Sequence, residues 1–130
     1  MTTFPEKYLD LLKDETKAFL FLATLMKDGS PQVTPVWFDW DGEHIRINTA
    51  AGRVKDRNMQ ARPTVAMVIQ DPADPYRYLQ IRGEIVGRTA EGGAEHIDAL
   101  SHKYRNRPYD LPAGQVRVIF LVKPTHFDQH

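Results

Sequence analysis

Three cations lie within five residues of one another in the stretch NTAAGRVKDRNM, residues 48–59. They are Arg53, Lys55 and Arg57, and they stand where a run typical of a strand gives way to a run typical of a helix. Helical spacing places Arg53 and Arg57 on one face, while Lys55 reaches round from the adjacent side. Together they could bind an extended anion.

The same junction offers groups that suit phosphate. A helix N-terminus carries unpaired N–H groups and a partial positive charge, so Thr49, the backbone of residues 50–52 and Arg53 form a plausible phosphate cradle. The alternative interpretation is a solvated charged face, neutralised by Asp56 and water. The neighbouring aromatic run favours the phosphate cradle, because an apolar surface beside an anion-binding site suits a nucleotide-like cofactor.

The run at residues 31–40 has apolar bulk on both of its predicted faces. Strand alternation assigns its side chains as follows: Val33, Pro35 and Trp37 to one face, and Thr34, Val36, Phe38 and Trp40 to the other. A proline cannot donate to a strand ladder, so Pro35 favours an edge or a bulge where backbone groups could face a ligand. We therefore predict that Thr34, Pro35, Val36 and Trp37 form a wall of the site.

The sequence predicts that the elements that position these residues are mostly β-strands. Turn signals at residues 28–29 and 41–42 separate three β-prone runs, which predict an antiparallel meander. We expect helices at 5–14, 52–62 and 94–104, and further strands at 64–70, 76–89 and 115–127. The order α-β-β-β-α-β-β-α-β predicts one domain, residues 1–130, built as a β-barrel with accessory helices.

Composition excludes several classes of protein. Lys plus Arg and Asp plus Glu both total 17 in 130 residues, so bulk attraction to nucleic acid or an anionic membrane is not expected. The absence of cysteine removes disulfides, zinc thiolates and cysteine nucleophiles. No apolar run is long enough to cross a bilayer, and the acidic N-terminal stretch does not resemble a signal peptide. We expect a cytoplasmic protein.

Rival catalytic and metal sites have little support in the sequence. His96 and His102 are six residues apart without a His-Glu-x-x-His pattern, so we predict surface histidines and no metal site. Neither serine lies in G-x-S-x-G, and both G-x-G-x-x-G and the P-loop pattern are absent. We predict no catalytic side chain, which suits an enzyme whose cofactor carries the chemistry.

Two segments carry a resemblance to a known family, NTAAGRVKDRN and DPADPYRYLQIRG. With the flanking runs, they make the chain resemble the flavin- and deazaflavin-binding split β-barrel family, the pyridoxamine 5'-phosphate oxidase-like group. Within that group it is most similar to small oxidoreductases that use the deazaflavin coenzyme F420. The resemblance extends over nearly the whole chain, from FLATLMKDGSPQVTPVW to VRVIFLVKPTHF.

The resemblance implies a homodimer with two cofactor sites at the subunit interface and hydride transfer between F420 and a small organic substrate. It assigns the residues by motif position: Thr34, Pro35, Val36 and Trp37 to the cofactor ring, Asn48 and Thr49 to the phosphoribityl region, and Arg53, Lys55 and Arg57 to phosphate. An FMN-binding oxidase or reductase of the same fold is the first alternative. A binding protein without enzymatic activity is the second.

Overall fold

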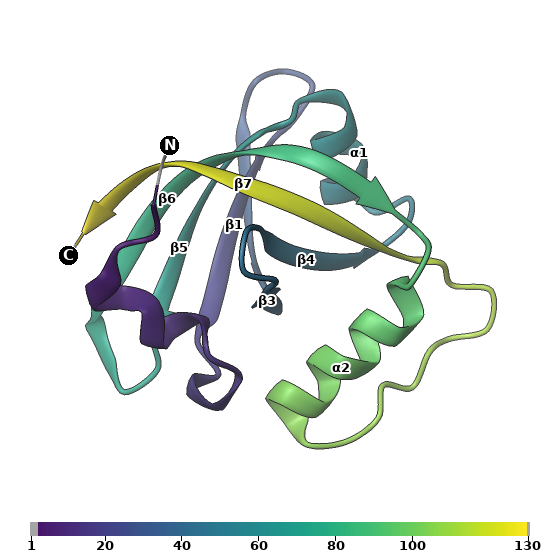
Figure 1. Cartoon of the computed structure of the whole chain (residues 1–130). Helices are drawn as coiled ribbons and strands as arrows, with labels where there is room; N and C mark the ends of the chain where they lie inside the picture. Colours follow the sequence, from purple (N-terminus) through teal and green to yellow (C-terminus); the bar gives the residue numbers. More distant parts are fainter. Residues whose placement is uncertain (1–2, 130) are drawn as a thin grey trace.

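The computed structural model describes residues 3–129, so the ends of the predicted domain 1–130 lie outside the described residues. The described chain folds as one curled antiparallel sheet with α-helices and short 3-10 helices around it (Figure 1). The elements are η1 (Glu6–Leu12), η2 (Asp14–Thr16), β1 (Phe19–Leu25), β2 (Pro31–Val36), β3 (Phe38–Trp40), β4 (Ile45–Ala50), α1 (Val54–Ala61), β5 (Thr64–Asp71), β6 (Asp74–Thr89), α2 (Gly93–Arg105) and β7 (Arg117–Gln129). This architecture confirms the prediction of a mostly β chain with accessory helices.

The order of strands in the sheet explains its curl. Neighbours run β2-β1-β5-β6-β7-β4-β3, so β2 and β3 form the two opposite edges. In the sequence, however, these two strands are separated by Trp37 alone. Because one residue spans only about 3.5 Å, the sheet must bend until its two edges meet at that residue. The result is a barrel wall closed by chain continuity and not by a ladder of hydrogen bonds.

The predicted three-run meander is therefore wrong in one respect. Its middle run divides at Trp37, and the two halves pair with different partners: Pro35 lies opposite Phe21 of β1, whereas Phe38 lies opposite Ile47 of β4. Both hairpins exist as the turn signals predicted. The alternation of side chains within the middle run did not indicate that its pairing changes from β1 to β4 at Trp37. The prediction that Pro35 lies on an edge strand is confirmed.

The core fills the inside of this curled sheet. In β5 every second residue is buried, and Met67 lies opposite Leu22 of β1 on one side and Ile81 of β6 on the other. Phe38 and Phe120 are fully buried near the junction of β3, β4 and β7. Such alternation leaves one side chain in two for the outer surface, as a half-barrel requires.

The N-terminal segment closes one end of the barrel. Tyr8, Leu11 and Leu12 of η1 are buried in the core, and the Phe4 ring meets Trp40 and Phe127 at centroid distances of 5.5 and 5.2 Å. The helix predicted at residues 5–14 is present as turns of the tighter 3-10 type, and Leu9 within it is 44% exposed.

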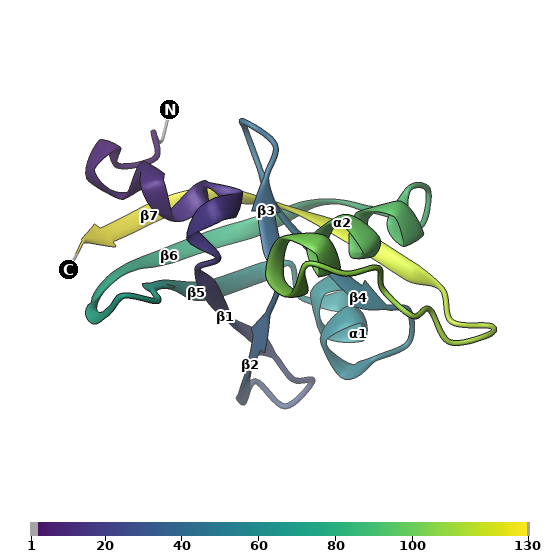
Figure 2. The same ribbon diagram turned by 90° about the horizontal axis from the view of Figure 1, so that it is seen from below.

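The helices α1 and α2 lie at the end of the barrel where β4 finishes (Figure 2). α1 directly follows β4, and its first turn holds the cations of the predicted anion site. α2 packs close to β7, because the absent side chain of Gly93 leaves room for the backbone of Arg117. Within residues 3–129, no helix is both long and apolar enough to cross a membrane.

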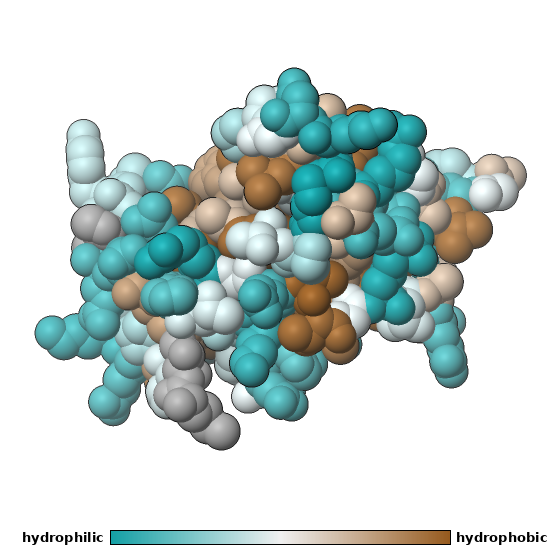
Figure 3. All heavy atoms as spheres, turned by 90° about the horizontal axis from the view of Figure 1, so that it is seen from above, coloured by the Kyte–Doolittle hydropathy of each residue, from teal (hydrophilic) through white to brown (hydrophobic). Residues whose placement is uncertain are grey.

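Hydrophobic side chains also reach the outer surface. On the face shown in Figure 3 they form small clusters between hydrophilic residues. Among the large apolar residues exposed anywhere on the described chain, Phe19 of β1 is 45% exposed and Val33 of β2 is 65% exposed. These two strands are neighbours at one edge of the sheet, so part of that edge presents apolar surface to its surroundings.

We expect Gly93→Ala to lower the free energy of unfolding by about 2 to 3 kcal/mol, because a methyl group there would overlap the carbonyl oxygen of Arg117. Ala94→Ser, at the exposed next position of α2, is the matched control and should change stability by less than about 0.5 kcal/mol. Urea unfolding followed by circular dichroism measures both. Equal stability of the two variants would contradict the close approach of α2 and β7.

Candidate functional site

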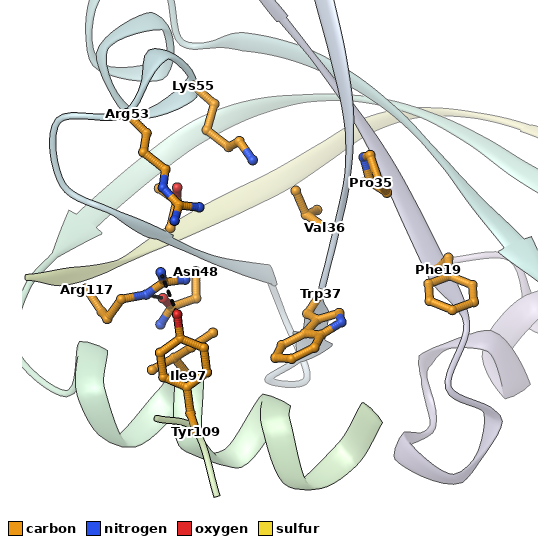
Figure 4. A pocket seen from close by; sticks show the side chains of 11 residues that line it. Phe19, Pro35, Val36, Trp37, Asn48, Arg53, Lys55, Ile97, Tyr109 and Arg117 are labelled. Carbon is orange, nitrogen blue, oxygen red and sulfur yellow. Dashed lines mark hydrogen bonds between the residues drawn. The ribbon is translucent and has the colours of Figure 1, made fainter. Parts of the chain in front are cut away.

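A cavity of about 360 Å³ opens where the two sheet edges meet, within the size range of small-molecule sites. In Figure 4 it extends from Arg53 and Lys55 at the start of α1, past Arg117 and Tyr109, to Val36 and Trp37 on the far side. The residues that line it are Phe19, Pro35, Val36, Trp37, Asn48, Thr49, Arg53, Lys55, Ile97, Tyr109 and Arg117.

The structure gathers most of the predicted site residues around this cavity. Those that line it are Pro35, Val36, Trp37, Asn48, Thr49, Arg53 and Lys55. Two predicted residues are outside the lining: Thr34 is half-buried opposite Leu22 in the β1–β2 ladder, and Arg57 is exposed on α1. Binding of a cofactor by these nine residues stays a prediction.

Sequence reasoning missed Arg117, the most deeply placed cation of the site. It is only 6% exposed, and its Nε donates to Oδ1 of Asn48 at 2.8 Å. Its Nη1 donates to Oε1 of Gln115 at 3.2 Å and lies 3.4 Å from the hydroxyl of Tyr109. A signal existed, because Arg117 is the one charged residue in the apolar run QVRVIFLV. A charge in a core strand needs a reason.

Arg53, Lys55 and Arg117 form a cationic group that lacks a carboxylate partner. No salt bridge links any of the three to an acidic side chain within residues 3–129. Burial, followed by the positive charges of Arg53 and Arg117, lowers the pKa of Lys55. Burial and the nearby Arg53 likewise lower the pKa of Arg117, against the opposing effect of Tyr109. An anion in this space would relieve both effects.

The alternative, in which Asp56 neutralises these charges, is not what the structure shows. Asp56 is 1% exposed and points away from the cavity, where it forms a salt bridge with Arg88 at 2.9 Å. It also accepts hydrogen bonds from the Gly52 N–H at 2.8 Å and from the Gln60 side chain at 3.1 Å. Its carboxylate thus holds the loop before α1 in place and leaves the cationic group unpaired.

The opposite end of the cavity is apolar and aromatic. Trp37 stacks on Tyr104 of α2 with the ring planes 8° apart and the centroids 5.4 Å apart. The Arg105 guanidinium lies 4.8 Å from the Trp37 ring centroid on α2's side of the site. These contacts hold the indole at the crossover between the sheet edges, beside Pro35 and Val36. A planar ring could lie against this surface.

Between the two ends, Thr49 lines the cavity. Its Oγ1 is buried and has no hydrogen-bond partner among the described residues. Because buried polar atoms are nearly always satisfied, this hydroxyl fits a hydrogen bond to a polar group of a ligand. Its neighbour Asn48 is fully engaged, since its amide contacts Arg117, the Gly93 carbonyl oxygen and His96.

The prediction of a surface His96 is wrong. The side chain is 5% exposed overall, and its Nδ1 lies 3.1 Å from Nδ2 of Asn48. Its Nε2 lies 3.1 Å from Oδ1 of Asp39. Arg46 donates to the same carboxylate, from Nε to Oδ1 at 2.8 Å and from Nη2 to Oδ2 at 2.7 Å. Burial tends to raise the pKa of Asp39, but the hydrogen bonds from His96 and Arg46 outweigh it and lower that pKa to about 2.

Comparison with protein-family models matches residues 4–130 to the model described as pyridoxamine 5'-phosphate oxidase. Among solved structures, an F420 reductase is 39% identical, with 98% of this chain and 100% of that chain covered and a TM-score of 0.85. A Listeria innocua protein is 20% identical, with 95% of each chain covered and a TM-score of 0.71.

A conserved hypothetical protein of Mycobacterium tuberculosis is 21% identical, with 96% of this chain and 83% of that chain covered and a TM-score of 0.71. At such identities the Listeria and Mycobacterium proteins show the shared fold alone. The comparison with curated proteins finds no match. The match over residues 4–130 and the split-barrel neighbours confirm the family resemblance and the fold class predicted from the sequence.

We expect Asp39→Asn to reduce the free energy of unfolding at pH 7 by about 2 kcal/mol, because the folded state holds the Asp39 pKa at about 2. A lowered pKa stabilises the fold above the ordinary value of 3.8, and this contribution is lost as pH falls from 3.8 towards 2. The difference from wild type, measured by urea unfolding at pH 7, 4 and 2.5, should therefore shrink towards acid. Asp110→Asn, at an exposed position, is the control, and a pH-independent difference would contradict the assignment.

Proposed function

The chain belongs to the pyridoxamine 5'-phosphate oxidase family, and from this premise we propose that it is an oxidoreductase that uses coenzyme F420. The proposed reaction moves a hydride between the deazaflavin and a small organic substrate. Members of this family bind flavin-type cofactors. The 39% identity with an F420 reductase over both full chains supports the deazaflavin.

One observation carries the proposal: the unpaired cationic group beside an aromatic wall. The phosphate of a flavin-type cofactor fits Arg53, Lys55 and Arg117, which bring three cations to one end of the cavity. Among the described residues, no carboxylate lines that cavity. Coenzyme F420 also carries an acidic oligoglutamate tail, which FMN lacks. Arg57, exposed on α1 one turn after Arg53, adds a cation outside the cavity lining that would be available to such a tail.

The remaining residues fit the other parts of the cofactor. Pro35, Val36 and Trp37 would hold the ring, and the free Thr49 hydroxyl would bond a polar group of the side chain. When bound, the deazaflavin supplies the hydride chemistry, so the chain's residues need only bind, orient and exclude water. A cavity lined with cations and aromatic side chains suits a protein that binds the cofactor and leaves the hydride chemistry to it.

We propose, in addition, that the protein is a homodimer with the cofactor site at the interface. Phe19 supports this, because its side chain lines the cavity near this edge of the sheet and is 45% exposed. A shallow groove on the same edge of the sheet continues the apolar surface through Phe21, Val33 and Val68. A second copy that covers this face would bury the groove and complete the wall of the cavity.

The first test is a titration of the purified protein with F420 and, separately, with FMN, followed by tryptophan fluorescence at two salt concentrations. Trp37 should report the ring in either case. Tight and salt-sensitive binding of F420, with reduction of an acceptor by reduced F420, is the expected result. Preference for FMN would move the function to an FMN-dependent oxidase or reductase, and binding without hydride transfer would leave a binding protein without enzymatic activity.

We expect Lys55→Ala to weaken binding of both cofactors by about 1 to 3 kcal/mol, because Lys55 lines the cavity where phosphate is proposed to lie. Arg57→Ala is the matched variant on the same helix. It should weaken binding of F420 alone, because Arg57 is outside the lining and only the acidic tail would reach it. Isothermal titration calorimetry of each variant with each cofactor measures this. A loss of FMN affinity in Arg57→Ala as large as in Lys55→Ala would contradict the placement.

A further inference from the structure

Two partners that each have a single chemical role identify the orientation of the Asn48 side-chain amide. The Nε–H of Arg117 can only donate, so the atom of Asn48 that it meets at 2.8 Å must be the oxygen. The carbonyl oxygen of Gly93 can only accept, so the atom that it meets at 2.9 Å must be the NH₂ group. The two contacts agree, and a flipped amide would lose both.

This orientation dictates the protonation of His96. Because the NH₂ group of Asn48 faces Nδ1 of His96 at 3.1 Å, that ring nitrogen must accept and carries no proton. The other ring nitrogen, Nε2, faces the carboxylate of Asp39 at 3.1 Å and must donate. The geometry therefore specifies the neutral Nε2–H tautomer of His96, although a carboxylate lies beside it.

Asp39 supplies the fixed end of this chain of hydrogen bonds. Its two hydrogen bonds from Arg46 hold the carboxylate in place and keep it ionised, so it presents an acceptor to His96 and never a donor. The sequence of contacts runs from β3 through α2 to β4 and ends at Arg117 on β7. The three side chains that follow Asp39 in this network, those of His96, Asn48 and Arg117, are all buried.

We propose that His96 is a positioning residue for the cavity. By presenting an unprotonated Nδ1, it holds Asn48 in the orientation that aims the guanidinium of Arg117 at a bound anion. His96 contacts neither the cavity nor a ligand in this arrangement, since its side chain is absent from the lining. The role parallels that of outer partners that fix the ring orientation of metal-binding histidines, here applied to a cation that binds an anion. This inference rests on the proposed anion site, but its first test needs no cofactor.

The first test is an NMR measurement of the imidazole nitrogens of the wild-type protein, without ligand, at pH 7.5. The expected spectrum has His96 as the Nε2–H tautomer, with the Arg117 Nε–H signal protected from exchange with water. A His96 that carries its proton on Nδ1, or on both nitrogens, would overturn the proposal. This measurement does not depend on any variant folding correctly.

The second test compares two neutral substitutions. His96→Asn keeps an oxygen near the Nδ1 position and can still accept from Asn48, whereas His96→Gln places its amide near Nε2 and serves Asp39 instead. We expect His96→Asn to bind F420 and inorganic sulfate within about 2-fold of wild type, and His96→Gln to bind both about 5-fold more weakly, as loss of one hydrogen bond predicts. The Arg117 Nε–H protection should follow the same order.

The readouts separate this proposal from the proposed function. If the wild type fails to bind F420 but sulfate and the Nε–H protection still distinguish the two variants, the positioning role holds and the cofactor assignment fails. If both variants lose affinity and protection equally, His96 is a packing residue only and the proposal fails. If neither variant differs from wild type in any readout, Asn48 keeps its orientation without His96 and the proposal also fails.

Discussion

The single residue between β2 and β3 is the constraint on which the rest of the structure depends. Since β2 and β3 are opposite edges of the sheet, the chain can pass between them at Trp37 only if the sheet is curled into a barrel. The curl brings Val36 of one edge and Asn48 beside the other edge to the same cavity, although four strands lie between β2 and β4 in the order of the sheet. The cavity is the space left at this seam, and no hydrogen-bonded ladder fills it.

The seam also explains how the fold tolerates the buried Arg117 and the half-buried Lys55 beside the exposed Arg53. Removing a charge from water is unfavourable unless polar partners replace the water, and here neutral groups do so. The guanidinium of Arg117 donates to the side-chain amide oxygens of Asn48 and Gln115, and it lies 5.3 Å from the centroid of the Tyr109 ring. Carboxylates would stabilise these cations further, but they would also occupy the space that an anionic ligand needs. The acidic groups nearby, Asp56 and Asp39, are instead committed to Arg88 and Arg46.

Much of this arrangement could be predicted from the sequence, for reasons visible at particular residues. Local signals were sufficient for the hairpins, for the edge position of Pro35 and for Arg53 and Lys55 at the start of a helix. The order of the predicted elements and the family resemblance both indicated the barrel. Arg117, Tyr109 and the burial of His96 were not predicted, because each depends on which strand or helix lies beside which. His96 is separated by 48 residues from Asn48, and Arg117 by 69, so neither local periodicity nor spacing could pair them.

The geometry assigns different tasks to the two ends of the cavity. At the cationic end, the buried Asn48 side chain holds the guanidinium of Arg117 in place, as a site that binds a phosphate with fixed orientation requires. At the other end, Phe19 and Pro35 lie on strands at an open edge, and Phe19 remains half-exposed. A cofactor anchored by its phosphate would thus extend its ring towards this edge, which the second copy of the proposed homodimer would cover. In the proposed enzyme the partner copy would therefore shape the space beside the ring, whereas the network from Asp39 to Arg117 would act at the phosphate. Cofactor binding and substrate choice would then depend on different residues of the same seam.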